Sequence, residues 1–203
     1  MRGGNFKIKL LIGGVIILFS FLRYCSQTDT NEYTGKKQHI SLSTEDEISL
    51  GLKSAPQMAQ EYGGLHPDQE AQALVDRVGS KLVSSSVARE TPYHYEFHLL
   101  RDPQTVNAFA LPGGQVFITA GLFSRLNTED QLAGVLGHEI GHVVGRHSAE
   151  RIAKQNLTQG ILTGVLAGSD QGGAQMAAMV ANIVNMKYGR EDELESDQLG
   201  VKF

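Results

Sequence analysis

The chain has 203 residues, of which 41% are hydrophobic and 20% are charged, and its formal net charge is −4. This length suits one globular domain with a buried core and a separate N-terminal segment. A mildly acidic chain without a basic stripe argues against nucleic acid as a partner. The single cysteine, Cys25, has no second cysteine with which to form a disulfide inside the chain.

An apolar segment lies near the N-terminus. Three basic residues precede thirteen uncharged, mostly apolar residues, 10–22, and Arg23 follows them. As a helix this run is about 20 Å long, against ~30 Å for the hydrocarbon core, so an export signal and a membrane anchor both fit its length. No small-residue cleavage pattern follows, which favours residues 1–25 as an uncleaved anchor over a cleaved or lipidated terminus. The excess of basic residues before the run predicts a cytoplasmic N-terminus and an external domain.

Two helices are expected after the anchor. Residues 26–42 are rich in Ser, Thr, Asn and Gln and have no apolar period, so we expect a tether there. Ser43 or Thr44 is the expected N-cap of a helix that has acids in its first turn and ends at about Tyr62. Pro67-Asp68 opens a second helix through about residue 86, whose apolar residues recur at helical spacing.

A small sheet is expected next, because the period changes to alternation. In "YHYEFHLLRD" this pattern places His94 and His98 on the polar face of a strand, which predicts a solvated face and not a metal site. Two short strands then flank the turn Pro112-Gly113-Gly114. Since the strands and helices are segregated along the chain, we expect an α+β fold that is mostly helical.

The segment "GVLGHEIGHVVGRHS" contains the clearest chemical motif. Thr128, with Gln131 three residues later, predicts a capping box and a helix that begins about ten residues before His138. On that helix His138 and His142 share one face, with Glu139 beside them. This is the arrangement of a zinc hydrolase, in which two imidazoles hold the metal and a neighbouring carboxylate accepts a proton. Two core histidines with a buried glutamate would instead leave three polar groups in need of partners.

Four glycines at 134, 137, 141 and 145 lie along one side of this predicted helix. Each costs the helix about 1 kcal/mol relative to alanine, so a close contact must offset the loss. We therefore expect another helix or strand to press against the face that carries the histidines.

A zinc site needs a third protein ligand, and two candidates are present. His147 is one residue short of the metzincin spacing, and on a continuing helix it points away from the other histidines, to the polar back of the helix with Arg146 and Arg151. The alternative is Glu193 in "YGREDELESDQLGV", followed one turn later by Asp197, which can hydrogen-bond a ligand imidazole. We favour Glu193, and we expect a solvated helix face at the other acids: Glu191, Asp192 and Glu195.

The segments "NAFALPGGQVFITAGL", "HEIGHVVGRHS" and "YGREDELESD", in this order, resemble the metallopeptidase family that contains the bacterial membrane protease HtpX and the CAAX prenyl proteases, most closely its periplasmic branch. The resemblance covers about residues 45–203. It implies a zincin-type gluzincin with one Zn²⁺ per chain, held by His138, His142 and Glu193. It also implies that Glu139 is the general base and that Asp197 is a proton donor or a carboxylate behind the ligands. In such proteins the strand after the Pro-Gly-Gly turn, here about 115–119, lies at the cleft edge, where a substrate chain can add to the sheet.

The resemblance also sets the expected domain limits. We expect a peptidase domain over residues 43–203 that is truncated at its C-terminal end, because relatives continue with further helices. Between the motifs, two small-residue segments of about eleven residues each, on either side of "GSDQGG", are too short to span a bilayer. We expect them to form a helical hairpin on or near the site.

The expected function is zinc-dependent cleavage of polypeptides, with misfolded or unassembled envelope proteins as the substrates. The enzyme would sit at the bacterial cytoplasmic membrane with its domain facing the periplasm or the exterior. The alternative is a catalytically silent, metal-binding chaperone or scaffold at the membrane. The oligomeric state is left open.

Overall fold

The computed structural model describes residues 3–168 and 188–203, which form two compact units. The first unit consists of residues 1–30, 36–41 and 149–188, and the second of residues 31–35, 42–148 and 189–203. Among the described residues, 149–168 belong to the same unit as the N-terminal segment. The boundary expected at residue 43 stays a prediction.

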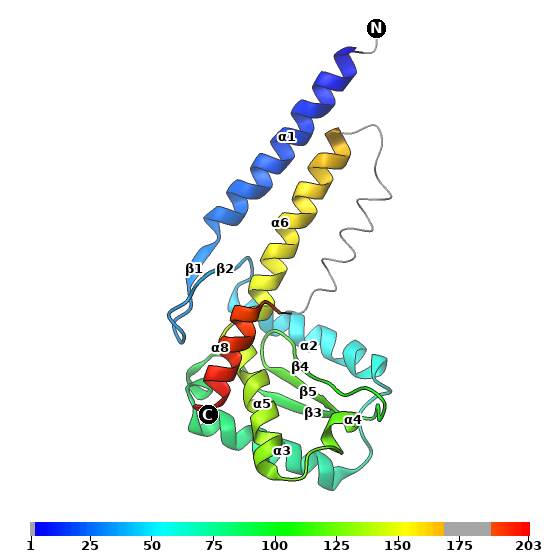
Figure 1. The fold of residues 1–203 in the computed structure, drawn as a ribbon, viewed down its shortest axis with the longest axis vertical. Coiled ribbons are helices and arrows are strands. Elements are labelled where there is room, and N and C mark those ends of the chain that lie inside the picture. The colour runs from blue at the N-terminus through cyan, green and yellow to red at the C-terminus, as the bar shows by residue number, and fades with distance from the viewer. Residues whose placement is uncertain (1–2, 169–187) are drawn as a thin grey trace. The chain divides into compact units, whose positions relative to one another are not determined.

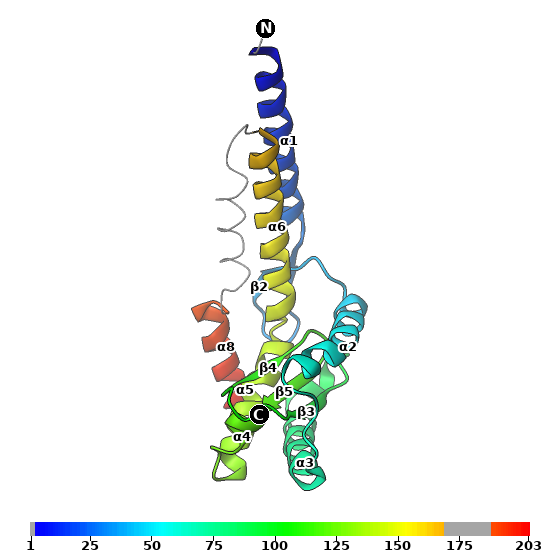
Figure 2. The same ribbon diagram turned by 90° about the vertical axis from the view of Figure 1, so that its right-hand side faces the viewer.

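The first unit contains two long helices, α1 (Gly3–Ser26) and α6 (His147–Gly168), of which α6 enters it at Ala149. They lie side by side in both ribbon views (Figures 1 and 2). Residues 6–26 are long and apolar enough to cross a membrane, the only such helix within the described residues. The helix continues beyond the thirteen-residue apolar run on both sides, so at 24 residues it is about 36 Å long and exceeds the hydrocarbon thickness.

The tether expected at residues 26–42 is not a featureless linker. It contains two short antiparallel strands, β1 (Thr28–Thr30) and β2 (Lys37–His39). Gln38 of β2 is fully buried, and its side-chain amide donates to Glu150 Oε2 at 3.4 Å. Polar composition suggests solvation, whereas this glutamine has a buried partner far along the chain, and the role of residues 26–42 as a tether stays a prediction.

The second unit begins with the two expected helices, which are confirmed. These are α2 (Thr44–Glu61) and α3 (Gln69–Ser85). Ser43 caps α2 in a capping box with Asp46, and Asp68 caps α3 through two backbone N–H groups. A 3-10 turn, η1 (Val87–Glu90), leads from α3 to the sheet.

The sheet has three strands in the order β3-β5-β4. They are β3 (Glu96–Leu100), β4 (Ala108–Ala110) and β5 (Gln115–Thr119), followed by the short helix α4 (Ala120–Phe123). β3 begins three residues later than the alternation predicted. His94 is exposed, as expected, but His98 is half-buried: its ring hydrogen-bonds Gln115 at 2.8 Å and stacks on Phe117. The hairpin is confirmed, with Gly113 and Gly114 at φ 82° and 104°, where other residues are strained.

One prediction about the sheet is wrong. Strand β5, over residues 115–119, is the central strand and is buried along its whole length, so it is not at an edge. It pairs in parallel with β3 and antiparallel with β4. The edge strand beside the helix that carries HEIGH is β4. Alternation and turn signals locate strands, but they do not give the order of strands in a sheet.

Two further helices complete the second unit: α5 (Glu129–Val144) and α8 (Arg190–Gly200). Figure 2 shows α8 beside α5 on one side of the sheet and α2 on the other. The main core lies between α3, α5 and the sheet and includes the fully buried residues Val75, Leu99, Val116, Ile118, Leu136 and Ile140. The expected α+β, mostly helical class is confirmed.

The helical hairpin expected between the motifs is tested only in part. Its first segment belongs to α6, which at 22 residues is longer than the eleven expected and packs against α1 in the first unit. Its second segment lies outside the described residues.

Candidate metal centre

Helix α5 presents both histidines of the HEIGH segment on one side. Thr128 caps the helix by accepting the backbone N–H of Gln131 at 3.2 Å, as expected. The return bond differs from the predicted capping box, because Gln131 accepts from the backbone of Asn127. With its start set in this way, α5 places His138 and His142 one turn apart, and their Nε2 atoms are 3.0 Å apart.

The close contact expected along the glycine stripe is made by α8. A Cβ at Gly141 would lie 2.9 Å from the carbonyl oxygen of Ser196, and a Cβ at Gly137 would lie 3.2 Å from that of Gly200. Gly134 has no atom within 4 Å of such a Cβ, and the atoms nearest to a Cβ at Gly145 belong to the ring of His147, not to α8. Two of the four glycines therefore let α8, with its acidic side chains, approach the histidines.

Glu193 of α8 meets the two histidines. One ligand atom each from His138, His142 and Glu193 lies within 4.8 Å of the others, the one group of this kind within the described residues. Ligands about 2.0–2.1 Å from a tetrahedral zinc ion lie about 3.3 Å from each other. The separation of 3.3 Å between His138 Nε2 and Glu193 Oε2, and that of 3.0 Å between the two Nε2 atoms, match this geometry.

The hydrogen bonds of the His138 and His142 rings also fit metal binding. His138 Nδ1 lies 2.8 Å from Asp197 Oδ1, and His142 Nδ1 lies 2.9 Å from His147 Nδ1. If each Nδ1 carries the donated proton, each Nε2 is left with a lone pair. Two lone pairs 3.0 Å apart repel each other unless a cation or a proton lies between them. These residues therefore fit a zinc ion, and Asp197 lies behind the imidazole of His138, where a carboxylate can orient a ligand.

His147 does not lie on the polar back of a continuing helix, and that prediction is wrong. The chain breaks between α5 and α6, where Arg146 adopts φ 55°, a left-handed conformation that is uncommon for residues other than glycine. The break turns His147 inward, where it is fully buried against His142. Its Nε2 donates to Glu195 Oε2 at 2.9 Å, and its Nδ1 also lies 3.2 Å from Ser196 Oγ.

Arg146 is likewise not a solvated residue. Its guanidinium forms an ion pair with Glu47 of α2, which is only 2% exposed, and donates to the carbonyl oxygen of Leu42 at 3.1 Å. The Tyr93 hydroxyl donates to the same carboxylate at 3.0 Å. A buried charge is costly without a partner, so this cluster stabilises the break that follows α5. No local sequence signal links these residues, which are far apart along the chain.

The acids of α8 differ from the expected solvated face. Asp192 is buried and its carboxylate accepts the backbone N–H of Gly189 at 3.3 Å, while Glu195 is the partner of His147. Glu191 is exposed, as expected. Charge alone suggested solvation, and only the packing of α8 on α5 shows which carboxylates are engaged.

Glu139 lies beside the histidines and is 8% exposed. Burial raises the pKa of Glu139 to about 7; His138 opposes this rise and the Glu193 carboxylate adds to it. Burial also lowers the pKa of His142 to about 3, with His147 and His138 contributing. His142 is therefore neutral near pH 7, the state that binds a metal ion, and Glu139 is in a range suited to proton transfer.

A groove of about 680 Å³ opens onto these side chains. His138, Glu139 and Asp197 line one part of it. Asn107 and Ala108, at the start of the edge strand β4, line another part, and Arg125 is also in its wall. An extended chain bound along β4 would thus pass the buried carboxylate of Glu139.

The chain is similar to known proteins over the part that contains this site. The family model described as peptidase family M48 matches residues 69–203, which include α5 and α8. The mitochondrial metalloendopeptidase OMA1 of Schizosaccharomyces pombe is 31% identical over 132 residues, which are 64% of this chain and 36% of that protein. The beta-barrel assembly-enhancing protease of Escherichia coli is 31% identical over 117 residues, 58% of this chain and 23% of that protein.

A shorter and more similar stretch is shared with the putative beta-barrel assembly-enhancing protease of Vibrio cholerae, at 41% identity over 66 residues, 32% of this chain and 13% of that protein. In each of these matches the chain spans little more than a third, or less, of the relative's length. The family resemblance seen in the three sequence segments is confirmed, and the chain belongs to peptidase family M48.

Proposed function

We propose that this chain is a zinc-dependent metalloendopeptidase that hydrolyses peptide bonds. The observation that carries the proposal is the convergence of His138, His142 and Glu193 beside the buried carboxylate of Glu139, in a groove bordered by an edge strand. In this proposal the three residues hold one Zn²⁺, Glu139 is the general base, and Asp197 orients His138 from behind.

A zinc ion held there would supply Lewis-acid chemistry, polarising a peptide carbonyl and making water a better nucleophile at neutral pH. The residues of the chain do the rest. The Glu139 carboxylate accepts the proton that the attacking water loses and delivers it to the amine that leaves when the C–N bond breaks. Asp197 and the pair formed by His147 and Glu195 hold the two imidazoles in the orientation and tautomer that face the site.

The substrate segment is proposed to bind in an extended form along β4, by main-chain hydrogen bonds. This replaces the expectation that the strand over residues 115–119 receives it, because that strand is already paired on both sides. Main-chain recognition reads no side chain, which suits an enzyme that acts on many sequences. Misfolded or unassembled envelope proteins are the proposed substrates, a choice supported by the names of the bacterial relatives, which refer to β-barrel assembly.

We further propose that α1 anchors the enzyme in the bacterial cytoplasmic membrane, with its N-terminus inside. The excess of basic residues before the apolar run supports this orientation. In the proposed arrangement the peptidase acts at the outer face of that membrane, and no nucleic acid is involved.

The test is to measure zinc content and casein cleavage on the same samples of the detergent-solubilised full chain. Glu139→Gln should keep about one zinc per chain and lose about 10²–10⁴-fold in kcat/KM, because only the proton acceptor is removed. Glu193→Gln should lose both zinc and activity. Glu191→Gln, on the same helix but exposed, is the matched control and should change neither.

Three outcomes would contradict the proposal in different ways. Full activity in Glu139→Gln would remove the general base. Unchanged zinc binding in Glu193→Gln would remove the third ligand. Zinc in the unaltered chain with no cleavage of any polypeptide, and with client binding that survives chelation, would favour the silent chaperone or scaffold.

A further inference from the structure

The contact between α1 and α6 shows which residues of the two helices lie opposite each other. A Cβ at Gly160 would lie 2.1 Å from Ser20 Oγ, and a Cβ at Gly164 would lie 2.7 Å from the carbonyl oxygen of Gly13. The two glycines are four residues apart, a spacing typical of close helix contacts in membranes. Because α6 runs antiparallel to α1, the residues of α6 that precede Gly160 lie beside the C-terminal end of α1.

The end of the apolar run on α1 indicates where this helix pair would leave the hydrocarbon core of a membrane. Only 6% of the most apolar part of α1 is buried, and large apolar side chains up to Leu22 are exposed. Such a surface is stable in the acyl chains of a bilayer and unstable in water. Arg23 follows immediately, and an arginine at this point extends its guanidinium into the headgroup layer. In the membrane anchoring proposed for α1, the level of Arg23 is therefore the boundary between hydrocarbon and headgroups.

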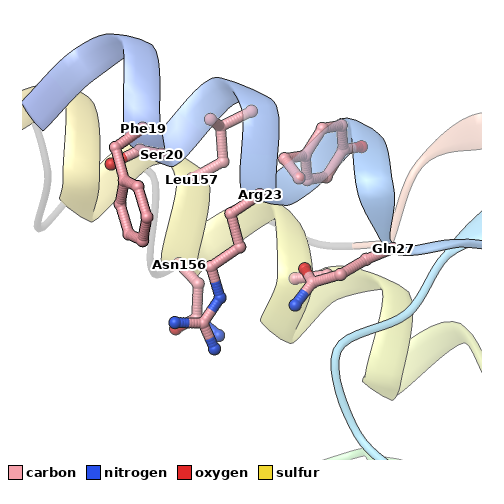
Figure 3. A pocket seen from close by; sticks show the side chains of 8 residues that line it. Phe19, Ser20, Arg23, Gln27, Asn156 and Leu157 are labelled. Carbon is pink, nitrogen blue, oxygen red and sulfur yellow. The ribbon is translucent and has the colours of Figure 1, made fainter. Parts of the chain in front are cut away.

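A pocket of about 310 Å³ lies at this level, between α1 and α6 (Figure 3). Its apolar lining includes Phe19, which lies one turn before Arg23 on α1, and Leu157, which follows Asn156 on α6. Its polar lining includes Arg23, Gln27 and Asn156, whose polar ends are turned toward the same opening in Figure 3. The pocket thus combines apolar walls with polar and positively charged groups, as a ligand with acyl chains and an acidic headgroup requires.

The polar groups of the pocket are available to a ligand. Among residues 3–168 and 188–203, the side chains of Arg23, Gln27 and Asn156 make no hydrogen bond or ion pair. Glu150 is an acid close enough to interact electrostatically with Tyr24, which lines the pocket. The negative charge of Glu150 is already compensated by ion pairs with Lys154 at 3.0 Å and Lys36 at 3.8 Å. The pocket therefore has a net positive charge and unused hydrogen-bond donors.

We propose that this pocket binds the headgroup of an anionic phospholipid. The guanidinium of Arg23 is suited to donate two parallel hydrogen bonds to phosphate oxygens, and the amides of Gln27 and Asn156 donate to the remaining oxygens. Phe19 and Leu157 contact the start of the acyl chains. The bound lipid ties α6 to α1 at the membrane surface. The proposal rests on the proposed anchoring of the chain by α1 and is independent of the proposed peptidase chemistry.

The test is native mass spectrometry of the full chain, released from nanodiscs that contain equal parts of phosphatidylglycerol and phosphatidylcholine. The chain should keep one phosphatidylglycerol in preference to phosphatidylcholine. Arg23→Gln should reduce the occupancy by about fivefold, the effect of one basic residue at an anionic surface. Arg23→Lys should restore part of it, since it keeps the charge and loses the two-pronged geometry. Asn156→Ala should weaken binding without any change in charge.

Lys7→Gln is the matched control, because it removes one positive charge from the same helix away from the pocket and should leave the bound lipid in place. Equal retention of both lipids, or unchanged occupancy in Arg23→Gln, would overturn the proposal. So would displacement of the signal by soluble glycerol phosphate at low millimolar concentration, since the ligand would then be a free phosphate. A chain that does not co-float with liposomes would overturn it as well. Zinc content, unaffected by any of these substitutions, reports separately on the proposed peptidase.

Discussion

At the scale of single residues, His147 connects the buried imidazole of His142 to the carboxylate of Glu195. The two links are 2.9 Å each, and His147 is fully buried. A carboxylate behind a ligand imidazole raises its basicity and keeps it in one tautomer. In the proposed zinc site a second imidazole would transmit that effect, so Glu195 would act on the metal without touching it.

We expect His147→Ala to weaken zinc binding by about 10–100-fold, the range found for partners behind metal ligands. Glu195→Gln should give a smaller loss in the same direction, because the amide still accepts the hydrogen bond but carries no charge. Competition with a zinc chelator measures both. His98→Ala, which removes a half-buried histidine that bonds Gln115 instead, is the control and should leave zinc affinity unchanged. Wild-type affinity in His147→Ala would show that His142 needs no support.

The buried carboxylate of Glu139 should make the stability of the folded chain depend on pH. Its pKa rises from 4.5 to about 7 on folding of the metal-free chain, so the folded state binds the extra proton. The stabilisation from that proton is complete below pH 4.5 and is lost as pH rises through about 7. His142 has the opposite sign, because its pKa falls to about 3 and its contribution is lost as pH falls. The two effects oppose each other, so the comparison with Glu139→Gln isolates one of them.

Metal-free wild type should therefore lose about 3 kcal/mol of unfolding free energy, relative to Glu139→Gln, between about pH 4.5 and pH 7. Unfolding of both chains in the presence of chelator, at several pH values, measures the difference. If the gap between them stays constant with pH, the carboxylate is ionised in the folded chain and the assigned cause is wrong.

At the scale of elements, the packing of α8 on α5 determines whether the site exists. Glu193, Glu195 and Asp197 all lie on α8, whereas the histidines lie on or just after α5. Helices approach this closely only where Gly137 and Gly141 leave room. The glycines that weaken α5 as an isolated helix are thus the reason that its histidines meet their partners.

Gly141→Ala should lower the unfolding free energy by about 1–3 kcal/mol, the usual cost of overpacking, and should weaken zinc binding because α8 is displaced. Its Cβ would press on the backbone of Ser196, which has no flexible end that can move away. Gly134→Ala is the matched control on the same helix, with no atom within 4 Å of the new Cβ, and should stabilise the chain by up to about 1 kcal/mol. Thermal unfolding and zinc titration of both variants test the pair, and equal effects would contradict the packing argument.

At the scale of the whole molecule, the proposed membrane anchor leads to a topological prediction that the single cysteine can test. Cys25 is exposed and lies near the C-terminal end of the apolar helix. With the N-terminus inside, Cys25 faces the outside of the cytoplasmic membrane. A membrane-impermeant maleimide should therefore label it in intact spheroplasts as fully as after lysis.

A double variant supplies the control for this experiment. Lys7→Cys in a Cys25→Ser background places the only cysteine at the opposite end of α1 and should be labelled only after lysis. Labelling of both positions from the outside would argue against a spanning helix. The reverse pattern would show that the orientation is inverted.

The sequence by itself determined much of this protein, wherever the signal is local. The caps at Ser43, Asp68 and Thr128, the Pro-Gly-Gly hairpin and the face shared by His138 and His142 follow from interactions within a few residues. Helical and strand periods, hydrogen-bonded caps and glycine turns depend on neighbours along the chain, so the order of residues is sufficient to predict them. The family resemblance follows from three such segments in order.

Only the tertiary structure decided the rest, because the partners come from distant parts of the chain. The inward turn of His147 depends on the left-handed Arg146, whose guanidinium is paired with Glu47 from another helix. The central place of β5 depends on its parallel pairing with β3, and burial of Gln38 depends on Glu150. A sequence gives the charge and polarity of such residues, but whether each is solvated or engaged is decided by packing, which brings together groups that no local period connects.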